Sequence, residues 1–293
     1  MLFGRRALVT GGSQGLGREI ARAFLAASAD VAICARSAAD ISRAGAALAE
    51  EFPQRRVLAL PCDVARIEHL DNFYMAAIEA LGELDIVVNN AGVHGPIGSI
   101  DDIDWDGWTE AVATNLLGTA YSCRLAIRHF KSQRRQCRGR AKIVNLSGGG
   151  ATAPQPGLSA YGASKAGIVR LTETLAKEVE GEGIDINAMA PGALATRLTT
   201  ELLEAGPERV GLDHHTRISD LLGKGGASPE RAAELCVYLA SAESDGLTGR
   251  LISAVLDPWP FTDEAKQGVA RSDIYALRRI VPKDRGKTWG NMH

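Results

Sequence analysis

The stretch Thr10-Gly11-Gly12-Ser13-Gln14-Gly15-Leu16-Gly17 decides the fold of this 293-residue chain. It follows a short apolar run, Ala7–Thr10, that predicts a β-strand. It opens an amphipathic segment, Leu16–Ala29, that predicts a helix. Glycines let the backbone approach a pyrophosphate closely, and a helix N-terminus supplies N–H donors and positive potential. A glycine-rich turn between the first strand and first helix of a βαβ unit therefore indicates a dinucleotide-binding site.

Short β-branched runs alternate with longer helix-period segments along the rest of the chain. Strands are expected at Ala7–Thr10, Val31–Cys34, Val57–Leu60, Ile86–Asn89, Ile143–Leu146, Ile184–Ala188 and Leu251–Val255. Helices are expected at Leu16–Ala29, Ala38–Glu51, Ile67–Leu81, Trp105–Phe130 and Ser159–Glu180. This alternation predicts an α/β fold, a doubly wound Rossmann-type parallel sheet of about seven strands with helices on both faces.

No linker or internal repeat divides the chain, so we expect one dinucleotide-binding and catalytic domain over residues 1–257. Two segments fall outside the strand–helix rhythm. Residues 193–224 are long, polar and partly helical, which is typical of a substrate lid. Residues 258–293 form a C-terminal extension. Basic and apolar residues alternate in it, so we expect it to pack across a subunit interface or to cover the mouth of the active site.

Composition argues against several classes of protein. Lys and Arg number 33 against 35 Asp and Glu, a formal charge of -2, so nothing calls for nucleic acid or an anionic membrane as partner. The five cysteines include no C-x-x-C pair and indicate reduced thiols in a cytoplasmic protein. No apolar run approaches the ~20 residues of a membrane helix, and no secretory leader precedes the first strand. No metal site is expected, because His214 and His215 are adjacent with no carboxylate spaced to complete a ligand set.

Tyr161 and Lys165 are four residues apart within an expected helix, so their side chains share one face. A free phenol has a pKa near ~10, which is too high for an effective base at neutral pH. A neighbouring cation stabilises the phenolate and lowers that pKa. Lys165, together with an oxidised nicotinamide, is expected to tune Tyr161 as a general acid and base.

These motifs together resemble the short-chain dehydrogenase/reductase family, in its single-domain branch. The resemblance covers residues 4 to about 257 and rests on motifs in a fixed order: the T-G-x-x-x-G-x-G turn, Asn89-Asn90-Ala91-Gly92, Asn115, Tyr161 with Lys165, and Pro191-Gly192 followed by Thr196. It implies an NAD(P)-dependent oxidoreductase that interconverts a secondary alcohol and a ketone or aldehyde by hydride transfer, with Tyr161 as general acid/base. It also implies a homodimer or homotetramer.

The same resemblance assigns the residues that bind the cofactor. They are Gly11, Ser13, Gln14, Gly15, Leu16, Gly17, Asp63, Val64, Asn89, Ala91, Gly92, Tyr161, Lys165, Pro191, Gly192 and Thr196. Within this set Asp63 matches the family's adenine contact, and Thr196 matches the residue that holds the carboxamide. Lys165 would also bind the nicotinamide ribose, and Asn115 would hold a water that links the lysine to solvent.

The end of the second strand bears on the choice of nicotinamide. Ala35 stands where NAD-preferring relatives often carry aspartate, and Arg36 follows it. An arginine can pair with the 2′-phosphate of NADP. Gln14 is evidence in the other direction, because many NADP users carry a second basic residue at that place in the glycine turn. We expect NADP to be preferred, with NAD as a second possibility.

The family's substrate-positioning serine has no direct counterpart. Counting back thirteen residues from Tyr161 gives Gly148, whereas Ser147 lies one residue earlier. A one-residue shift on a strand reverses the direction of the side chain. Three hypotheses stay open: Ser147 serves after local rearrangement, a backbone N–H of Gly148 or Gly149 or the Ser159 hydroxyl replaces it, or the protein is a catalytically weak nucleotide-binding sensor or scaffold.

The substrate class is indicated by residues near the expected site. His94 follows the fourth strand, and Arg197, His214, His215 and Arg217 lie in the expected lid. They favour a polar or anionic small molecule with an alcohol or carbonyl group, such as a sugar-like compound or a hydroxy acid. The glycines after Ser147 leave room beside the nicotinamide for a bulky substrate.

Overall fold

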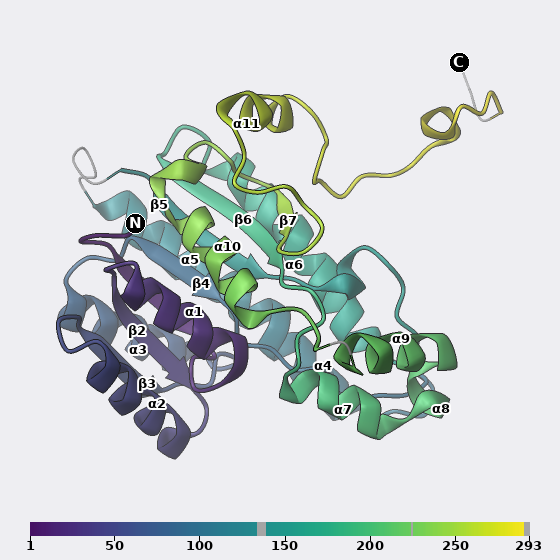
Figure 1. Cartoon of the computed structure of the whole chain (residues 1–293), viewed down its shortest axis with the longest axis horizontal. Helices are drawn as coiled ribbons and strands as arrows, with labels where there is room; N and C mark the ends of the chain where they lie inside the picture. The colour runs from purple at the N-terminus through teal and green to yellow at the C-terminus, as the bar shows by residue number, and fades with distance from the viewer. Residues whose placement is uncertain (134–138, 224, 290–293) are drawn as a thin grey trace.

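The buried apolar runs of the sequence pair side by side in one parallel sheet (Figure 1). The computed structural model describes residues 1–133, 139–223 and 225–289. Within them the strands are β1 (Arg6–Thr10), β2 (Asp30–Ala35), β3 (Val57–Pro61), β4 (Ile86–Asn89), β5 (Ala141–Leu146), β6 (Ile184–Ala190) and β7 (Leu251–Ser253). Their order across the sheet is β3-β2-β1-β4-β5-β6-β7. The predicted doubly wound α/β fold is confirmed.

Helices cover both faces of the sheet, and each face has its own apolar core. One core joins the sheet to α1 (Gly15–Ala26), α2 (Ala38–Glu51) and α10 (Pro229–Ala240). The other joins it to α3 (Ile67–Leu81), α5 (Gly118–Ser132) and α6 (Ser159–Glu178). The strands are consequently buried on both sides, which explains why they are continuous apolar runs rather than alternating ones.

The strand order reverses between β1 and β4, because the chain builds outward from β1 to β3 first and then from β4 to β7. In open parallel sheets, ligands bind in the crevice beyond the carboxyl ends of the strands at this switch point. The Asn90 amide connects the two strand ends, donating to the carbonyl oxygen of Thr10 at 2.9 Å. The topology therefore brings the glycine turn next to the loop that follows β4.

The expected helix Trp105–Phe130 is divided. It consists of α4 (Trp105–Val112), a π-helical turn η1 (Ala113–Leu117) and α5. Single π turns occur frequently at functional sites. This one carries Asn115, whose side chain is fully buried.

The predicted lid is mostly helical and has a small core of its own. It comprises α7 (Arg197–Ala205), α8 (Pro207–Val210) and α9 (Leu212–Gly223). Leu202, Val210 and Ile218 from these helices pack with Leu158, which directly precedes α6. The lid is thereby attached to the element that carries Tyr161.

The C-terminal extension begins inside the main core. Trp259 and Phe261 are buried in the core that includes α10, and they lead into α11 (Asp263–Ala270). The backbone N–H of Leu251 in β7 then donates to the Tyr275 carbonyl at 2.9 Å, so this segment follows the outer edge of β7. Beyond it, the arm containing η4 (Pro282–Arg285) projects from the body, and Trp289 is 70% exposed (Figure 1).

Within the described residues, no helix has the length and apolarity needed to cross a bilayer. Cys34, Cys62, Cys123 and Cys236 are buried free thiols, whereas Cys137 lies outside the described residues. The same residues contain no group of three or more His, Cys, Asp or Glu side chains that could hold a metal ion.

Candidate active site

The glycine turn between β1 and α1 depends on missing side chains. Gly11 has a φ of +70°, and a Cβ there would lie 2.8 Å from the Asn90 amide nitrogen. A Cβ at Gly17 would collide with the Gly11 carbonyl oxygen. Gln14 precedes α1 in extended conformation, and its side chain makes no capping hydrogen bond. The turn thus presents bare backbone and the start of a helix to the crevice, as a phosphate-binding turn requires.

A cavity of about 1100 Å³ opens beyond the carboxyl ends of the strands. Most of the residues predicted from the sequence line it: Gly11, Ser13, Gln14, Gly15, Leu16, Gly17, Arg36, Val64, Ala91, Gly92, Ser147, Tyr161, Lys165, Pro191, Gly192 and Thr196. The cavity exceeds the ~300–1,000 Å³ of common ligand pockets, so it has room for a dinucleotide and a small substrate together. No described residue of the C-terminal extension lines it, so the expected cover over the mouth is absent from the described chain.

Two predicted cofactor contacts, Asp63 and Asn89, do not line the cavity. The Asp63 carboxylate accepts from the backbone N–H of Ala65 at 3.0 Å and so shapes the turn after β3. The Asn89 amide is buried and donates to the Asn145 side chain at 2.8 Å. Their chain neighbours Cys62, Val64 and Asn90 do line the cavity.

Asn115 also lies behind the cavity wall rather than on it. Its amide accepts from the backbone N–H of Val93 at 2.9 Å and donates to the Val93 carbonyl at 2.8 Å. A Cβ on Gly92 would lie 3.2 Å from the Asn115 amide oxygen and 3.5 Å from the Lys165 ammonium. Asn115 therefore holds the loop after β4 in place, next to the lysine.

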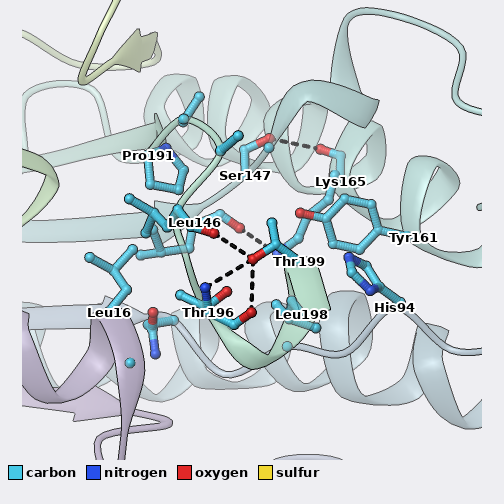
Figure 2. A pocket seen from close by; sticks show the side chains of 18 of the residues that line it. Leu16, His94, Leu146, Ser147, Tyr161, Lys165, Pro191, Thr196, Leu198 and Thr199 are labelled. Atoms are coloured by element: carbon cyan, nitrogen blue, oxygen red, sulfur yellow. Dashed lines mark hydrogen bonds between the residues drawn. The ribbon is translucent and has the colours of Figure 1, made fainter. Parts of the chain in front are cut away.

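Tyr161 and Lys165 lie together on one wall of the cavity, with His94 on the other side of the phenol (Figure 2). Their spacing on α6 brings the Lys165 ammonium to 5.5 Å from the centre of the Tyr161 ring. The ammonium donates to the Leu146 carbonyl at 2.8 Å. The His94 ring meets the phenol edge-on, with ring centres 4.9 Å apart.

Burial is the main cause of the shifted pKa values on this wall. It raises the pKa of Tyr161 to about 12 and lowers the pKa of Lys165 to about 8. The expected lowering of the phenol's pKa by Lys165 is therefore outweighed by desolvation in this structure. Burial also lowers the pKa of His94 to about 4, with the charge of Lys165 as the next cause. At neutral pH the wall thus holds a neutral phenol, a neutral imidazole and an ammonium.

The hydroxyl candidates for positioning a substrate are both engaged elsewhere. Ser147 lines the cavity, but its hydroxyl donates to the Lys165 backbone carbonyl at 3.3 Å, against α6 (Figure 2). The Ser159 hydroxyl accepts from the Trp108 indole at 3.1 Å, and Ser159 does not line the cavity. At Gly148, a Cβ would lie only 2.5 Å from the Tyr161 phenol oxygen. The phenol therefore occupies the place of any side chain at that position.

Two residues of this site, Asn90 and Gln155, are not among those predicted from the sequence. Asn90 lines the cavity and links the ends of β1 and β4. Gln155 also lines the cavity, from the loop between η2 (Gly149–Ala151) and α6. Its place at the carboxyl end of a central strand, between Pro154 and Pro156, was the available signal.

The lid and the loop after β4 contribute polar groups whose charges are partly balanced. His94 from that loop, and Arg197, His214 and Arg217 from the lid, line the cavity. The Arg197 guanidinium pairs with Glu201 at 3.1 Å, and the Nδ1 atoms of His94 and His214 are buried without a hydrogen-bond partner among the described residues. Thr196 lies at the N-terminus of α7, where its backbone N–H donates to the Thr199 hydroxyl at 2.9 Å.

Comparison with known proteins identifies the family. The model of the short chain dehydrogenases matches residues 5–206, most of the chain. The chain belongs to the short-chain dehydrogenase/reductase family. It is thus a member of an oxidoreductase family, as its motifs indicated.

Similar proteins include dehydrogenases with different substrates in their names. The short chain dehydrogenase/reductase astE of Aspergillus oryzae is 34% identical over 86% of this chain and 94% of its own. The L-fucose dehydrogenase of Oryctolagus cuniculus is 34% identical over 82% of this chain and 80% of its own. Among solved structures, the 3-ketoacyl-(acyl-carrier-protein) reductase from Brucella melitensis, complexed with NADH, matches with a TM-score of 0.73 and 26% identity. The match covers 86% of this chain and 97% of the Brucella melitensis chain.

Proposed function

We propose that this protein is an NADP(H)-preferring oxidoreductase that interconverts a secondary alcohol and a carbonyl group in a small polar, sugar-like substrate. The observation that supports this proposal most strongly is that Tyr161 and Lys165 lie side by side on the wall of the cavity that the glycine turn also lines. A dinucleotide on the turn would direct its reactive end toward the phenol. Tyr161 would then exchange a proton with the substrate oxygen.

The residues present fit a nicotinamide cofactor. The bare backbone of the glycine turn would hold the pyrophosphate, and Gly11 and Gly17 leave no room for larger residues. Lys165 would contact the nicotinamide ribose, and Thr196 the carboxamide. The cofactor would supply the hydride acceptor or donor. The solved structure from Brucella melitensis, which contains NADH, supports a nicotinamide cofactor but does not decide between NAD and NADP for this chain.

The protonation states define what Tyr161 does in each direction. With its pKa raised to about 12, the phenol carries its proton at neutral pH and can donate it to a carbonyl oxygen. Reduction therefore needs no prior ionisation. Alcohol oxidation needs the phenolate, which the Lys165 ammonium and a cationic nicotinamide would both stabilise.

The uncharged polar groups of the cavity suit a hydroxylated substrate. His94 is uncharged at neutral pH, because its pKa is lowered to about 4. Burial, followed by the charge of Arg217, lowers the pKa of His214 as well. Neutral imidazoles donate and accept hydrogen bonds as hydroxyl groups do. The charge of Arg197 is met by Glu201. The name of the L-fucose dehydrogenase relative agrees with this class.

NADP is favoured by Arg36, which lines the cavity just after β2. No acid stands at Ala35 to hold the ribose diol of NAD. Arg36 pairs with Glu110 at 3.6 Å across the exposed rim, and a 2′-phosphate would replace that partner. Arg36→Ala should raise the KM for NADP at least tenfold and leave that for NAD nearly unchanged. Arg43→Ala, an exposed arginine of α2 outside the cavity, is the matched control.

The proposed reaction is tested by a substrate screen with each nicotinamide, followed by absorbance of the reduced form. The panel contains L-fucose and related aldoses, 3-hydroxybutyrate and a 3β-hydroxysteroid. We expect turnover with at least one sugar, lowered at least ~10²-fold in Tyr161→Phe, since general acid–base catalysis contributes that much. Cofactor binding without turnover of any alcohol or carbonyl compound would instead favour the sensor or scaffold, which the relatives' names do not support.

A further inference from the structure

The position expected to carry the hydroxyl that holds the reacting oxygen of the substrate is a glycine, Gly148. Gly148 cannot carry one, because the phenol oxygen lies where its Cβ would be. The hydroxyls of Ser147 and Ser159 are bonded to the Lys165 carbonyl and the Trp108 indole. A proton donor such as Tyr161 works best when a second group fixes the acceptor oxygen, so another donor is expected nearby.

Gln155 occupies the space that the glycines after Ser147 leave free. A Cβ at Gly149 would lie 3.5 Å from the Gln155 Nε2 atom. A Cβ at Gly150 would lie 2.8 Å from the Gln155 Oε1 atom and 3.4 Å from Cδ1 of Tyr161. The amide and the phenol ring therefore flank the same point. Larger residues at these glycines would drive the amide away from the phenol.

The Gln155 amide is uncommitted. Its Oε1 atom is buried without a hydrogen-bond partner, and no hydrogen bond joins its side chain to any described residue. An unpaired buried polar group costs about 1–3 kcal/mol, so the Gln155 amide is available to bind a group that enters the cavity. Rotation about the last side-chain bond exchanges the positions of the Oε1 and Nε2 atoms. In either orientation the amide can therefore offer its N–H groups or its oxygen to a ligand. The loop itself is held by Pro154 and Pro156 and by a bond from Leu158 N–H to the Gln155 carbonyl at 3.2 Å.

We infer that the Gln155 amide binds the reacting oxygen of the substrate, in place of the hydroxyl that position 148 cannot provide. This inference rests on the proposed function. In the carbonyl-to-alcohol direction the Gln155 N–H donates to the carbonyl oxygen while Tyr161 transfers its proton to that oxygen. Gln155 itself gains and loses no proton, and in the reverse direction it holds the alcohol oxygen in the same place.

The test compares Gln155→Ala and Gln155→Glu with the unmodified enzyme, using the best sugar of the screen. We expect both variants to lose about 10²-fold in kcat at pH 7.5, the usual cost of removing one donor to a developing oxyanion. Binding of NADP and thermal stability should change little. Gln155→Glu retains the size of the side chain and guards against loss of fold. Gln54→Ala, the same kind of change at an exposed glutamine, is the matched control.

The glutamate variant gives a readout that a purely structural role would not produce. A carboxylate cannot donate to the substrate oxygen, but a protonated carboxyl group can. The kcat of Gln155→Glu relative to the unmodified enzyme should therefore rise as the pH falls from about 7 to about 5, because the protonated fraction of the carboxyl group grows as the pH approaches the ordinary Glu pKa of about 4.3. A constant ratio over that range contradicts the inference.

The failure of this inference can be told from failure of the proposed function. If Gln155→Ala keeps kcat within about threefold while Tyr161→Phe loses it, the glutamine is not the oxygen ligand. A raised KM with unchanged kcat would mean contact with a remote part of the substrate, which also overturns it. Absence of turnover in the unmodified enzyme would defeat the proposed function, and this inference with it.

Discussion

A buried lysine lies at each end of strand β5, Lys142 on the strand itself and Lys165 on α6, and their charges are compensated differently. At the start of the strand, Lys142 is 1% exposed and bonds to Asp185 at 2.9 Å and to Asp245 at 2.7 Å. Beyond its end, Lys165 is 4% exposed and donates to the Leu146 carbonyl, with no carboxylate within ion-pair distance in the described residues. A buried charge that is fully compensated belongs to the scaffold, whereas an uncompensated one indicates a functional site.

The difference has an energetic basis. Removing an ammonium from water costs several kcal/mol, which opposite charges in good geometry can offset. Asp185 is fully buried and also receives two hydrogen bonds from Arg140, at 2.8 and 2.7 Å. Lys165 has no such compensation, and burial lowers its pKa to about 8. The protein therefore tolerates a destabilising cation at the end of the sheet where the cavity opens.

The largest expected effect comes from removing the uncompensated cation. Lys165→Met should lower kcat about 10²–10⁴-fold, the range of general acid–base catalysis, because Tyr161 loses the charge that stabilises its phenolate. The folded protein should keep its thermal stability at pH 7 or gain slightly, since a buried charge without a counter-ion is removed. Steady-state kinetics and the thermal unfolding midpoint check both points. Near-normal turnover of Lys165→Met, or a large loss of its stability, would contradict the assignment of Lys165 to the functional site rather than to the scaffold.

The opposite outcome is expected at the other end of the strand. Asp185→Asn leaves Lys142 and Arg140 with one fewer buried counter-charge and should cost about 3–5 kcal/mol of unfolding free energy, measured by denaturant titration. The kcat per folded molecule should not change. Asp30→Asn removes the partner of Arg56 in a pair at the surface and is the control. We expect it to lose much less, because exposed pairs are screened by solvent. Equal losses in the two variants would contradict the distinction.

The sequence predicts a site residue well when the residue's own strand, turn or helix determines its position, and poorly when contacts with distant segments determine it. The glycine turn and the Tyr161–Lys165 pair were predictable, because strand–turn–helix geometry and helical spacing place them. Asp63 and Asn89 stay predicted cofactor contacts, but they do not line the cavity as their chain neighbours do, a difference that a one-residue step along extended backbone produces and that the sequence does not report. Gln155 went unnoticed because its role depends on space left by glycines on another segment, which no local pattern reports.

The next effect concerns the crowded end of β5. Gly148→Ala would insert a methyl group 2.5 Å from the Tyr161 phenol oxygen. Such overpacking costs about 1–3 kcal/mol, and here we expect it to displace the phenol and lower kcat roughly tenfold to a hundredfold. Gly162→Ala, whose Cβ would meet the Gly150 carbonyl oxygen at an ordinary 3.6 Å, is the control. Equal kinetics of the two variants would show that the phenol accommodates a side chain at position 148.

The last prediction concerns the pH dependence of kcat/KM, which should differ between the two directions of the reaction. Reduction uses the neutral phenol, so with a Tyr161 pKa raised to about 12 its kcat/KM should stay level from pH 6 to 8. Oxidation uses the phenolate, so its kcat/KM should rise about tenfold per pH unit below the phenol's pKa. His94 stays uncharged throughout, with its pKa at about 4. Above a pH of about 8 the Lys165 ammonium loses its proton, and the rise in oxidation should flatten there because the phenolate loses its cation. Parallel profiles in both directions, measured at constant ionic strength, would show that another group moves the proton.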